Sequence, residues 1–322
     1  QLTSHDSRNK AIIVPSIIPH PMSILRLEHV TKKYKDHVAV NDISFEVERG
    51  TIFGMLGPNG AGKTSTIRII TTITGPDSGK VYFEDEILNQ SHPARMGYLP
   101  EERGLYKKMK VGDHLIYLAR LKGLTAHDAA TRCKAMLHRF EALEWWNKKV
   151  EELSKGMQQK IQFIATIVHE PTLLILDEPF TGLDPINTSM IQNEIFRLKN
   201  KGVTILFSTH RMEQVEEMCE NIILINHGKN VLLGNVQEIR NTYKENLYEV
   251  GFKGNLPQQF NGGLELVKQY DHTAVFRIPD QDTPNHLLQY LMQSGCEIHA
   301  FHEILPSINE IFIRIVKGVS HE

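Results

Sequence analysis

The sequence predicts an α/β fold in which a mostly parallel sheet carries a binding site along one edge, followed by a smaller α+β domain. Three short apolar segments, residues 51–56, 172–176 and 202–207, have the length and composition of buried parallel strands. They are followed, respectively, by a glycine-rich loop, by the acid pair at 177–178, and by a polar segment that ends at His210. Because ligands of open α/β sheets bind at the carboxyl ends of the strands, we expect these groups to meet at one site.

The glycine-rich loop fits the phosphate-binding pattern, in which two glycines bracket four residues and precede Lys and Thr. Glycine lets the backbone adopt positive φ angles and turn its N–H groups toward a phosphate. Lys63 supplies a mobile charge for the β- and γ-phosphates, and the Thr64 hydroxyl is placed to bind Mg²⁺. A helix predicted over residues 64–73 adds a favourable dipole. The residues expected to bind nucleotide are Gly57, Pro58, Asn59, Gly60, Ala61, Gly62, Lys63, Thr64 and Ser65.

The acid pair and the histidine are expected to act on the phosphates. Asp177 would lie beside Mg²⁺, directly or through water, and Glu178 would orient or deprotonate the attacking water. A solvated turn is the alternative for two adjacent acids, but it fits poorly after an apolar run. A lone histidine is usually structural or exposed, yet His210 follows a buried strand, which favours a catalytic role.

Composition excludes several classes of protein. At 322 residues the chain is long enough for two domains, and 41% apolar and 23% charged residues are typical of a globular protein. The net charge of −2 gives no reason to expect a nucleic-acid partner. Cys133, Cys219 and Cys296 are far apart and odd in number, which favours reduced thiols over disulfides. The longest apolar runs are far short of a membrane span, so any membrane role requires a partner.

Three regions are expected along the chain. Residues 1–23 are predicted to be a disordered leader or a segment of artificial origin, with Met22 as a possible native start. Residues 24–235 form the nucleotide-binding domain, in which antiparallel strands precede the glycine loop and a helical subdomain covers about residues 104–170. Residues 236–322 form the small α+β domain.

Several side chains leave two interpretations open. Tyr34 could stack on an adenine, although a lone aromatic is more often part of a surface or a core. Trp145 and Trp146 either pack within the helical subdomain or contact a partner. Cys296, His299 and His302 suggest a metal site, but alternation along a strand would point His299 away from the other two, so we do not expect one.

With these motifs assembled in order, the chain resembles the ATP-binding subunits of ABC transporters over about residues 24–235. The resemblance implies a P-loop NTPase fold, the ABC nucleotide-binding domain, with a mixed sheet, an antiparallel β subdomain and a helical subdomain. It also implies that Tyr34 stacks on adenine. It implies catalytic roles for Glu178, His210 and Glu101, and binding of the metal ion by Thr64, Asp177 and Glu101. It further implies that the signature residues Ser154, Lys155, Gly156 and Met157 contact the ATP of a partner subunit, and that Asp184 belongs to the D-loop.

Two departures from the family pattern stand out. The signature sequence, usually Leu-Ser-Gly-Gly-Gln, is Leu-Ser-Lys-Gly-Met here, so that Ser154 and Gly156 are retained while Lys155 either helps to hold ATP or faces solvent. Glu101 stands where the family has the Q-loop glutamine, and it adds negative charge near the phosphates. Both departures, together with the C-terminal extension, are similar to sodium-extruding exporters of the NatA type.

The resemblance implies a function in transport. ATP and Mg²⁺ would be the cofactors, two copies would pair head to tail around two ATP molecules, and hydrolysis would power a separately encoded membrane permease, on the cytoplasmic face of the membrane. Export is favoured, with sodium as one candidate cargo. The alternatives are a soluble ABC-type ATPase that acts on ribosomes or nucleic acid, and a regulatory module that binds ATP without hydrolysing it. The single phosphate loop and the lack of cysteine pairs argue against the first, and Glu178 and His210 against the second.

Overall fold

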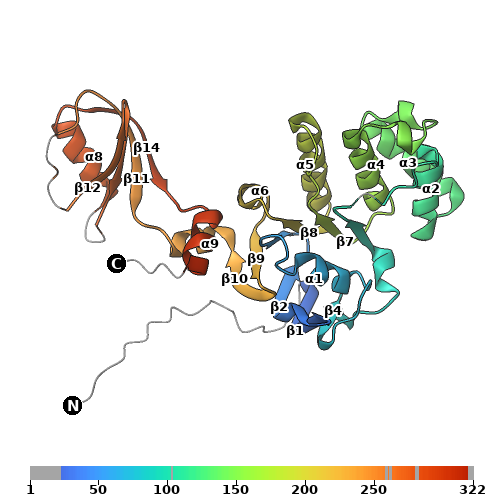
Figure 1. The fold of residues 1–322 in the computed structure, drawn as a ribbon. Coiled ribbons are helices and arrows are strands. Elements are labelled where there is room, and N and C mark those ends of the chain that lie inside the picture. The colour runs from blue at the N-terminus through green and yellow to red at the C-terminus, as the bar shows by residue number, and fades with distance from the viewer. Residues whose placement is uncertain (1–22, 103, 258–259, 261–262, 280–282, 318–322) are drawn as a thin grey trace, which may run out of the picture. The chain divides into compact units, whose positions relative to one another are not determined.

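The computed structural model describes residues 23–102, 104–257, 260, 263–279 and 283–317 (Figure 1). Apart from Ser23, where the first strand begins, the predicted leader lies outside the described residues. The chain divides into two compact units, of which the first ends at Asn235 and the second begins at Val236. Each unit has its own cluster of buried apolar side chains.

A six-stranded sheet in the first unit has the order β10-β9-β3-β8-β7-β6. All neighbouring strands are parallel except β10, which is antiparallel to β9. Every residue of β3, β7 and β8 is buried, which explains why the middle of each strand is continuously apolar instead of alternating. The strands are β3 (Ile52–Leu56), β6 (Met96–Leu99), β7 (Leu173–Asp177), β8 (Thr204–Thr209), β9 (Asn221–Asn226) and β10 (Lys229–Asn235).

A second, antiparallel sheet has the order β2-β1-β4-β5, formed by β1 (Ser23–Tyr34), β2 (His37–Glu48), β4 (Ser78–Phe83) and β5 (Glu86–Ile87). Strand β1 continues to Tyr34 although the alternation of apolar and polar residues in its sequence is interrupted. Several register shifts in its pairing with β2 accommodate these interruptions. The rings of Phe45 on β2 and Phe53 on β3 stack with centroids 5.4 Å apart, which joins the cores of the two sheets. The side chain of Asn230 also donates to the Ser44 carbonyl at 2.7 Å.

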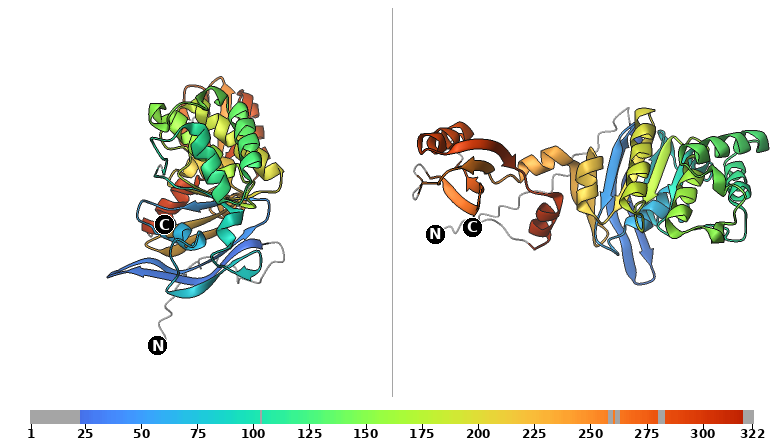
Figure 2. Two further views of the ribbon diagram at one scale, coloured as in Figure 1. Left: turned by 90° about the vertical axis from the view of Figure 1, so that its right-hand side faces the viewer. Right: turned by 90° about the horizontal axis from the view of Figure 1, so that it is seen from above.

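Helices flank the six-stranded sheet, as the two further views in Figure 2 show. The helical pattern of residues 111–144 forms two helices, because Gly123 has a φ of +96° and the Thr125 hydroxyl caps the second helix by accepting from the Asp128 N–H at 3.1 Å. The helices and short 3₁₀ turns of this unit are α1 (Lys63–Ile70), η1 (His92–Arg95), α2 (Val111–Leu121), α3 (Ala126–Arg139), η2 (Leu143–Trp145), η3 (Val150–Glu152), α4 (Lys155–Ile167), α5 (Pro185–Asn200) and α6 (Met212–Met218).

Both tryptophans pack inside the helical subdomain. Trp145 is buried, and the Lys160 ammonium lies 5.8 Å from the centroid of its ring. Trp146 lies against Gly112, where the ring leaves no space for a Cβ atom. Of the two interpretations that the sequence left open, the structure therefore supports packing.

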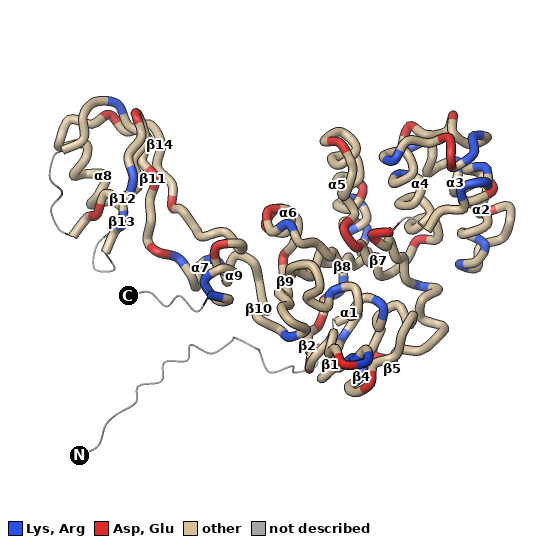
Figure 3. The backbone as a smooth tube through the Cα atoms, in the orientation of Figure 1, with Lys and Arg blue, Asp and Glu red and all other residues tan. Residues whose placement is uncertain are grey.

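The second unit is an α+β module, as predicted. It contains α7 (Val236–Thr242), β11 (Leu247–Lys253), β12 (Glu265–Tyr270), β13 (Thr273–Arg277), α8 (Pro284–Gln293), β14 (Glu297–Ile304) and α9 (Ile308–Lys317), with the antiparallel sheet order β12-β13-β11-β14. Leu287 and Leu291 of α8 are fully buried in a core that also includes Phe252 and Phe276. Figure 3 shows that the charged residues of both units are of mixed sign.

The expected orientation of Cys296, His299 and His302 is wrong. Cys296 is buried in the core of the second unit, whereas both histidines are exposed. A register shift beside Gly251 interrupts the alternation of side chains between the two faces of β14. His299 therefore lies over Gly251, on the same face as His302, which pairs with Glu249 at 2.8 Å. Within the described ranges, no group of three or more His, Cys, Asp or Glu side chains is arranged to hold a metal ion.

The three cysteines are free and buried. Burial raises the pKa of Cys133 to about 12, and it also raises the pKa of Cys219 and of Cys296. In the part of the chain that the structure describes, no helix combines the length and apolar character needed to span a membrane.

Phe163 provides a test of the packing between α3 and α4. It is fully buried, and its ring centroid is 5.8 Å from that of Phe140 at the end of α3. We expect Phe163→Ala to lower the free energy of unfolding by about 3–5 kcal/mol, measured by urea denaturation, because it leaves a cavity. The control Leu121→Ala, at a side chain that is 65% exposed, should change it by about 0.5 kcal/mol or less. Equal effects of the two substitutions would contradict this packing.

Candidate functional site

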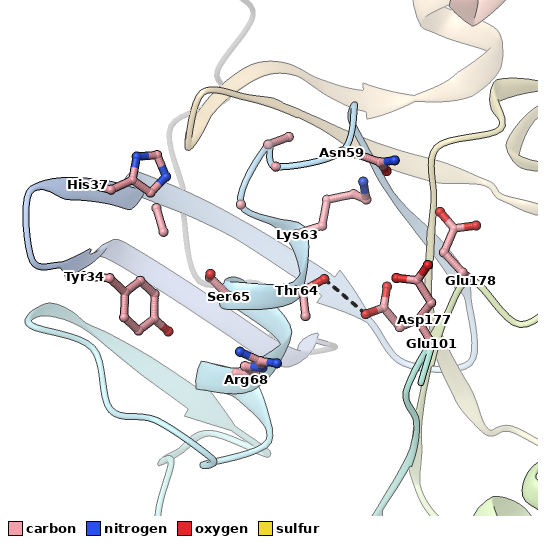
Figure 4. Close-up of a pocket in the computed structure, with 14 residues that line it drawn as sticks. Tyr34, His37, Asn59, Lys63, Thr64, Ser65, Arg68, Glu101, Asp177 and Glu178 are labelled. Carbon is pink, nitrogen blue, oxygen red and sulfur yellow. Dashed lines mark hydrogen bonds between the residues drawn. The ribbon is translucent and has the colours of Figure 1, made fainter. Parts of the chain in front are cut away.

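A pocket of about 490 Å³ lies where the carboxyl ends of β3, β6 and β7 meet the start of α1 (Figure 4). Its volume is in the range of small-molecule sites. Register explains the convergence, because Leu56 at the end of β3 is level with Thr209 on β8, and Ser208 is level with Asp177 on β7. The pocket is lined by Tyr34, His37, Ala39, Asn59, Gly60, Ala61, Gly62, Lys63, Thr64, Ser65, Arg68, Glu101, Asp177 and Glu178.

The loop between β3 and α1 requires glycine at two positions. Gly57 and Gly62 have φ angles of +153° and +112°. A Cβ atom at Gly57 would collide with the Ile225 carbonyl oxygen, and one at Gly62 would collide with the Ala39 carbonyl oxygen. The loop therefore follows a path that is fixed by the backbones of β9 and β2, and no side chain is accommodated there.

Lys63 is the first residue of α1, and its side chain lies across the loop. Its ammonium donates to the Gly57 carbonyl at 2.6 Å and to the Pro58 carbonyl at 3.2 Å. Burial lowers the pKa of Lys63, and the nearby carboxylates of Glu178 and Asp177 oppose that shift. The chain thus places one partly desolvated cation at the centre of the loop.

Asp177 is held between α1 and β8. Its Oδ2 accepts from the Thr64 hydroxyl at 3.3 Å and its Oδ1 accepts from the Ser208 hydroxyl at 2.8 Å. Burial raises the pKa of Asp177, and the nearby carboxylates of Glu101 and Glu178 raise it further, while the hydrogen bond from Ser208 lowers it. The carboxylate and the Thr64 hydroxyl offer the oxygen ligands that Mg²⁺ prefers.

Glu178 is fixed by the end of β8. Its Oε1 accepts from the backbone N–H of His210 at 2.8 Å and from the ring Nδ1 of His210 at 2.6 Å, and its Oε2 accepts from the Thr209 hydroxyl at 3.2 Å. The residue has a φ of +50°, in the left-handed region, which turns its side chain back toward β8. His210 does not line the pocket itself, so it reaches the site through Glu178.

Three lining residues were not predicted from the sequence. Arg68 is four residues after Thr64 on α1, so helical periodicity could have placed it on the pocket side. His37 is level with Tyr34 across the turn between β1 and β2, and only the pairing of these strands reveals that position. Ala39 lies on β2 with its carbonyl oxygen against Gly62, a contact that carries no sequence signal.

The residues of the predicted signature and D-loop do not line this pocket. Ser154 caps α4 by accepting from the Met157 N–H at 3.2 Å, and Lys155 is exposed beside it. Asp184 caps α5 by accepting from the Asn187 N–H at 2.9 Å, a hydrogen bond that lowers the pKa of Asp184. A Cβ atom at Gly156 would come within 3.8 Å of the Asn187 side chain, so the two helix starts are adjacent.

Comparison with known proteins identifies the family. The chain is 42% identical over 299 residues to the uncharacterized ABC transporter ATP-binding protein YhaQ of Bacillus subtilis (strain 168), a match that covers 92% of this chain and 99% of the relative. The chain belongs to the ATP-binding subunits of ABC transporters. Residues 40–181 match the ABC transporter family model, and residues 234–316 match the model of the ATP-binding protein DrrA1-3-like, C-terminal domain.

Two further matches refine this assignment. The ABC transporter ATP-binding protein NatA of Bacillus subtilis (strain 168) is 36% identical over 206 residues, which covers 62% of this chain and 83% of NatA. A solved structure of an ATP-binding subunit of an ABC transporter superposes with a TM-score of 0.65 at 28% identity, covering 69% of this chain and 93% of that one. The predicted fold and family are thus confirmed, and members of the family bind and hydrolyse ATP to power transport. The narrower NatA-type subgroup remains a proposal.

Lys63 offers a direct test of nucleotide binding. We expect Lys63→Ala to weaken ATP binding by about 1.5–3 kcal/mol, roughly 10- to 150-fold, because it removes a charge-assisted contact to phosphate. Fluorescence titration with a labelled ATP analogue measures the affinity. Lys201→Ala, which removes an exposed lysine at the end of α5, is the matched control and should leave the affinity unchanged. Equal affinities in the two variants would argue against a phosphate contact at Lys63.

Asp177 is predicted to reduce stability in the absence of ligand. Folding raises its pKa above 3.8, so its ionised form opposes folding at every pH above that value. Asp177→Asn should therefore raise the thermal midpoint of the nucleotide-free protein at neutral pH, and the gain should vanish as the pH falls below 3.8. Asp85→Asn, at an exposed turn, controls for the loss of one charge. A midpoint that falls at neutral pH would contradict the expectation.

Proposed function

We propose that this chain is the ATP-hydrolysing subunit of an exporter, that two copies pair head to tail around two ATP molecules, and that they drive a separately encoded permease. The observation that carries the proposal is the position of the signature residues. Ser154, Lys155, Gly156 and Met157 lie at the start of α4 and do not line the pocket of their own chain. This supports a role for these residues in binding the ATP phosphate of a second copy.

The start of α4 is suited to that phosphate. Helix N-termini carry free backbone N–H groups and a partial positive charge, and both favour anions. The first turn of α4 contains no acidic residue, and Lys155 adds an exposed positive charge. Asp184 at the adjacent start of α5 would then face the partner subunit.

The pocket supports a defined orientation of ATP. Tyr34 and His37 lie at one end, where their rings would contact the adenine, and the glycine loop lies toward the other end, where its N–H groups and Lys63 would hold the β- and γ-phosphates (Figure 4). Arg68, one turn after Thr64 on α1, also lines the pocket and would compensate phosphate charge (Figure 4). Asn59 and Ser65 complete the lining of the loop.

Thr64, Asp177 and Glu101 would hold Mg²⁺, which would neutralise phosphate charge in this class of reaction. The Asp177 carboxylate supports the assignment of a cation site. Its pKa is raised by burial and by two neighbouring carboxylates, and a divalent cation would relieve this excess of negative charge. Glu101 is exposed on the loop after β6 and lies beside Asp177, on the side of the pocket that faces Thr64 (Figure 4).

Glu178 would act as the general base for the attacking water. Its Oε1 is held by both the backbone and the ring of His210, so the carboxylate is preorganised for proton abstraction. His210 is 44% exposed, which leaves its ring accessible to the γ-phosphate and to the Asp184 region of a partner. Loss of the γ-phosphate would remove the charge that bridges the two copies, and the dimer would open.

The motion would reach the permease through residues 100–111, which join the pocket to the helical subdomain. The subunit would work at the cytoplasmic face of the membrane, where its permease holds it. Similarity to NatA supports sodium as one candidate cargo, although cargo is selected by the permease. A soluble ATPase acting on ribosomes or nucleic acid is disfavoured by the net charge of −2.

Glu178→Gln tests the paired mechanism. The variant keeps the shape of the side chain but lacks the base, so ATP should bind without being hydrolysed and trap a dimer that size-exclusion chromatography detects. Glu217→Gln, at an exposed acid on α6, should hydrolyse ATP normally and stay monomeric.

Adding Gly156→Asp to Glu178→Gln should abolish the trapped dimer, because it places a negative charge at the phosphate-binding end of α4. A Glu178→Gln protein that stays monomeric with ATP, while the wild type hydrolyses it, would refute head-to-tail pairing.

A further inference from the structure

Gln162 is a buried polar residue in the middle of α4, and its amide contacts the loop that carries Glu101. Its side chain is only 6% exposed. The Nε2 atom donates to the Pro100 carbonyl at 3.3 Å and to the Glu102 carbonyl at 3.3 Å. One amide group therefore holds the backbone on both sides of Glu101.

This arrangement has an energetic cost. The Oε1 atom of Gln162 is buried and has no hydrogen-bond partner in the described structure. A buried polar atom without a partner usually costs stability, and an apolar residue of similar size would avoid that cost. The two hydrogen bonds from the Gln162 amide to the loop offset this cost.

The position of the loop backbone determines where the Glu101 carboxylate lies. Glu101 is exposed, so packing against neighbouring side chains does not fix it. Its carboxylate lines the nucleotide pocket, adds to the raised pKa of Asp177, and opposes the effect of burial, which lowers the pKa of Lys63. A displacement of this loop would therefore change the negative charge beside the phosphates.

Gln162 is also rigidly connected to the signature residues. It is eight residues after Ser154 on the same helix, and α4 continues without interruption from Lys155 to Ile167. We infer that Gln162 is a positioning residue, which fixes Glu101 at the cation side of the pocket and transmits any shift of α4 to it. This inference rests on the proposed function for the role of Glu101 and for the ligand at the start of α4.

Limited proteolysis of the nucleotide-free protein tests the positioning itself. A protease specific for glutamate should cleave after Glu101 and Glu102 about tenfold faster in Gln162→Met, because cleavage follows local opening and two hydrogen bonds are lost. Gln158→Met is the matched control, since the Gln158 amide donates to the Val150 and Leu153 carbonyls at 3.2 Å and 3.0 Å and not to this loop. Unchanged cleavage in Gln162→Met, or an equal rise in the control, overturns the inference.

Gln162→Asn serves as a second variant if Gln162→Met does not fold. It keeps a buried amide but is one methylene shorter, so it should not bridge both carbonyls and should show the same faster cleavage. Cleavage at the wild-type rate in Gln162→Asn overturns the inference.

A binding measurement tests the link to the nucleotide site. The affinity for a fluorescent ATP analogue is measured with and without Mg²⁺, and the ratio is compared among variants. Glu101→Gln and Gln162→Met should each reduce the Mg²⁺ enhancement by about threefold, and the double variant should show no further loss. The affinity without Mg²⁺ should not fall in Gln162→Met, which distinguishes positioning from general damage to the pocket.

The outcomes separate this inference from the proposed function. Three outcomes would each overturn the link between Gln162 and the cation. They are a normal Mg²⁺ enhancement of ATP affinity in Gln162→Met, additive losses of that enhancement in the double variant, and an unchanged enhancement in Glu101→Gln. Head-to-tail pairing is decided independently by the Glu178→Gln dimer, which does not involve Gln162.

Discussion

The nucleotide site depends on the close contact between the glycine loop and two neighbouring backbones. The Ile225 carbonyl on β9 and the Ala39 carbonyl on β2 occupy the space that a Cβ at Gly57 or Gly62 would need. The six-stranded sheet and the antiparallel sheet therefore both define the path of the loop, and with it the direction of Lys63. A fold that lost either sheet would still contain the motif, but it would not hold the loop in this conformation.

Electrostatics give the second constraint on the site. Three carboxylates, those of Glu101, Asp177 and Glu178, line the pocket together with Lys63 and Arg68. Each acid is fixed in a different way: Asp177 by two hydroxyls, Glu178 by the end of β8, and Glu101 only through its loop. If Glu101 stands at the Q-loop position, as the family resemblance implies, the negative charge that replaces a glutamine lies on the least restrained of the three, which makes the support of that loop important.

Much of the site could be predicted from sequence, because short motifs encode local geometry. The apolar runs of β7 and β8 predicted buried strands, and the residues that follow them do meet at the pocket or contact it through Glu178. Contacts set by register could not be predicted: His37 reaches the pocket through the pairing of β1 with β2, and Gln162 meets its loop across the helical subdomain. The register shift beside Gly251 likewise placed on one face of β14 the two histidines that were expected on opposite faces. Individual roles at the site remain predictions.

The burial of all three native thiols has a practical consequence. Thiolates are the reactive form of cysteine, and burial raises the pKa of Cys133, Cys219 and Cys296, so maleimide reagents should attack them slowly while the protein stays folded. A cysteine introduced at an exposed position would then carry a fluorophore or spin label selectively, against the unmodified native background. Distance measurements between such labels could test whether two copies pair and separate, without first building a cysteine-free protein.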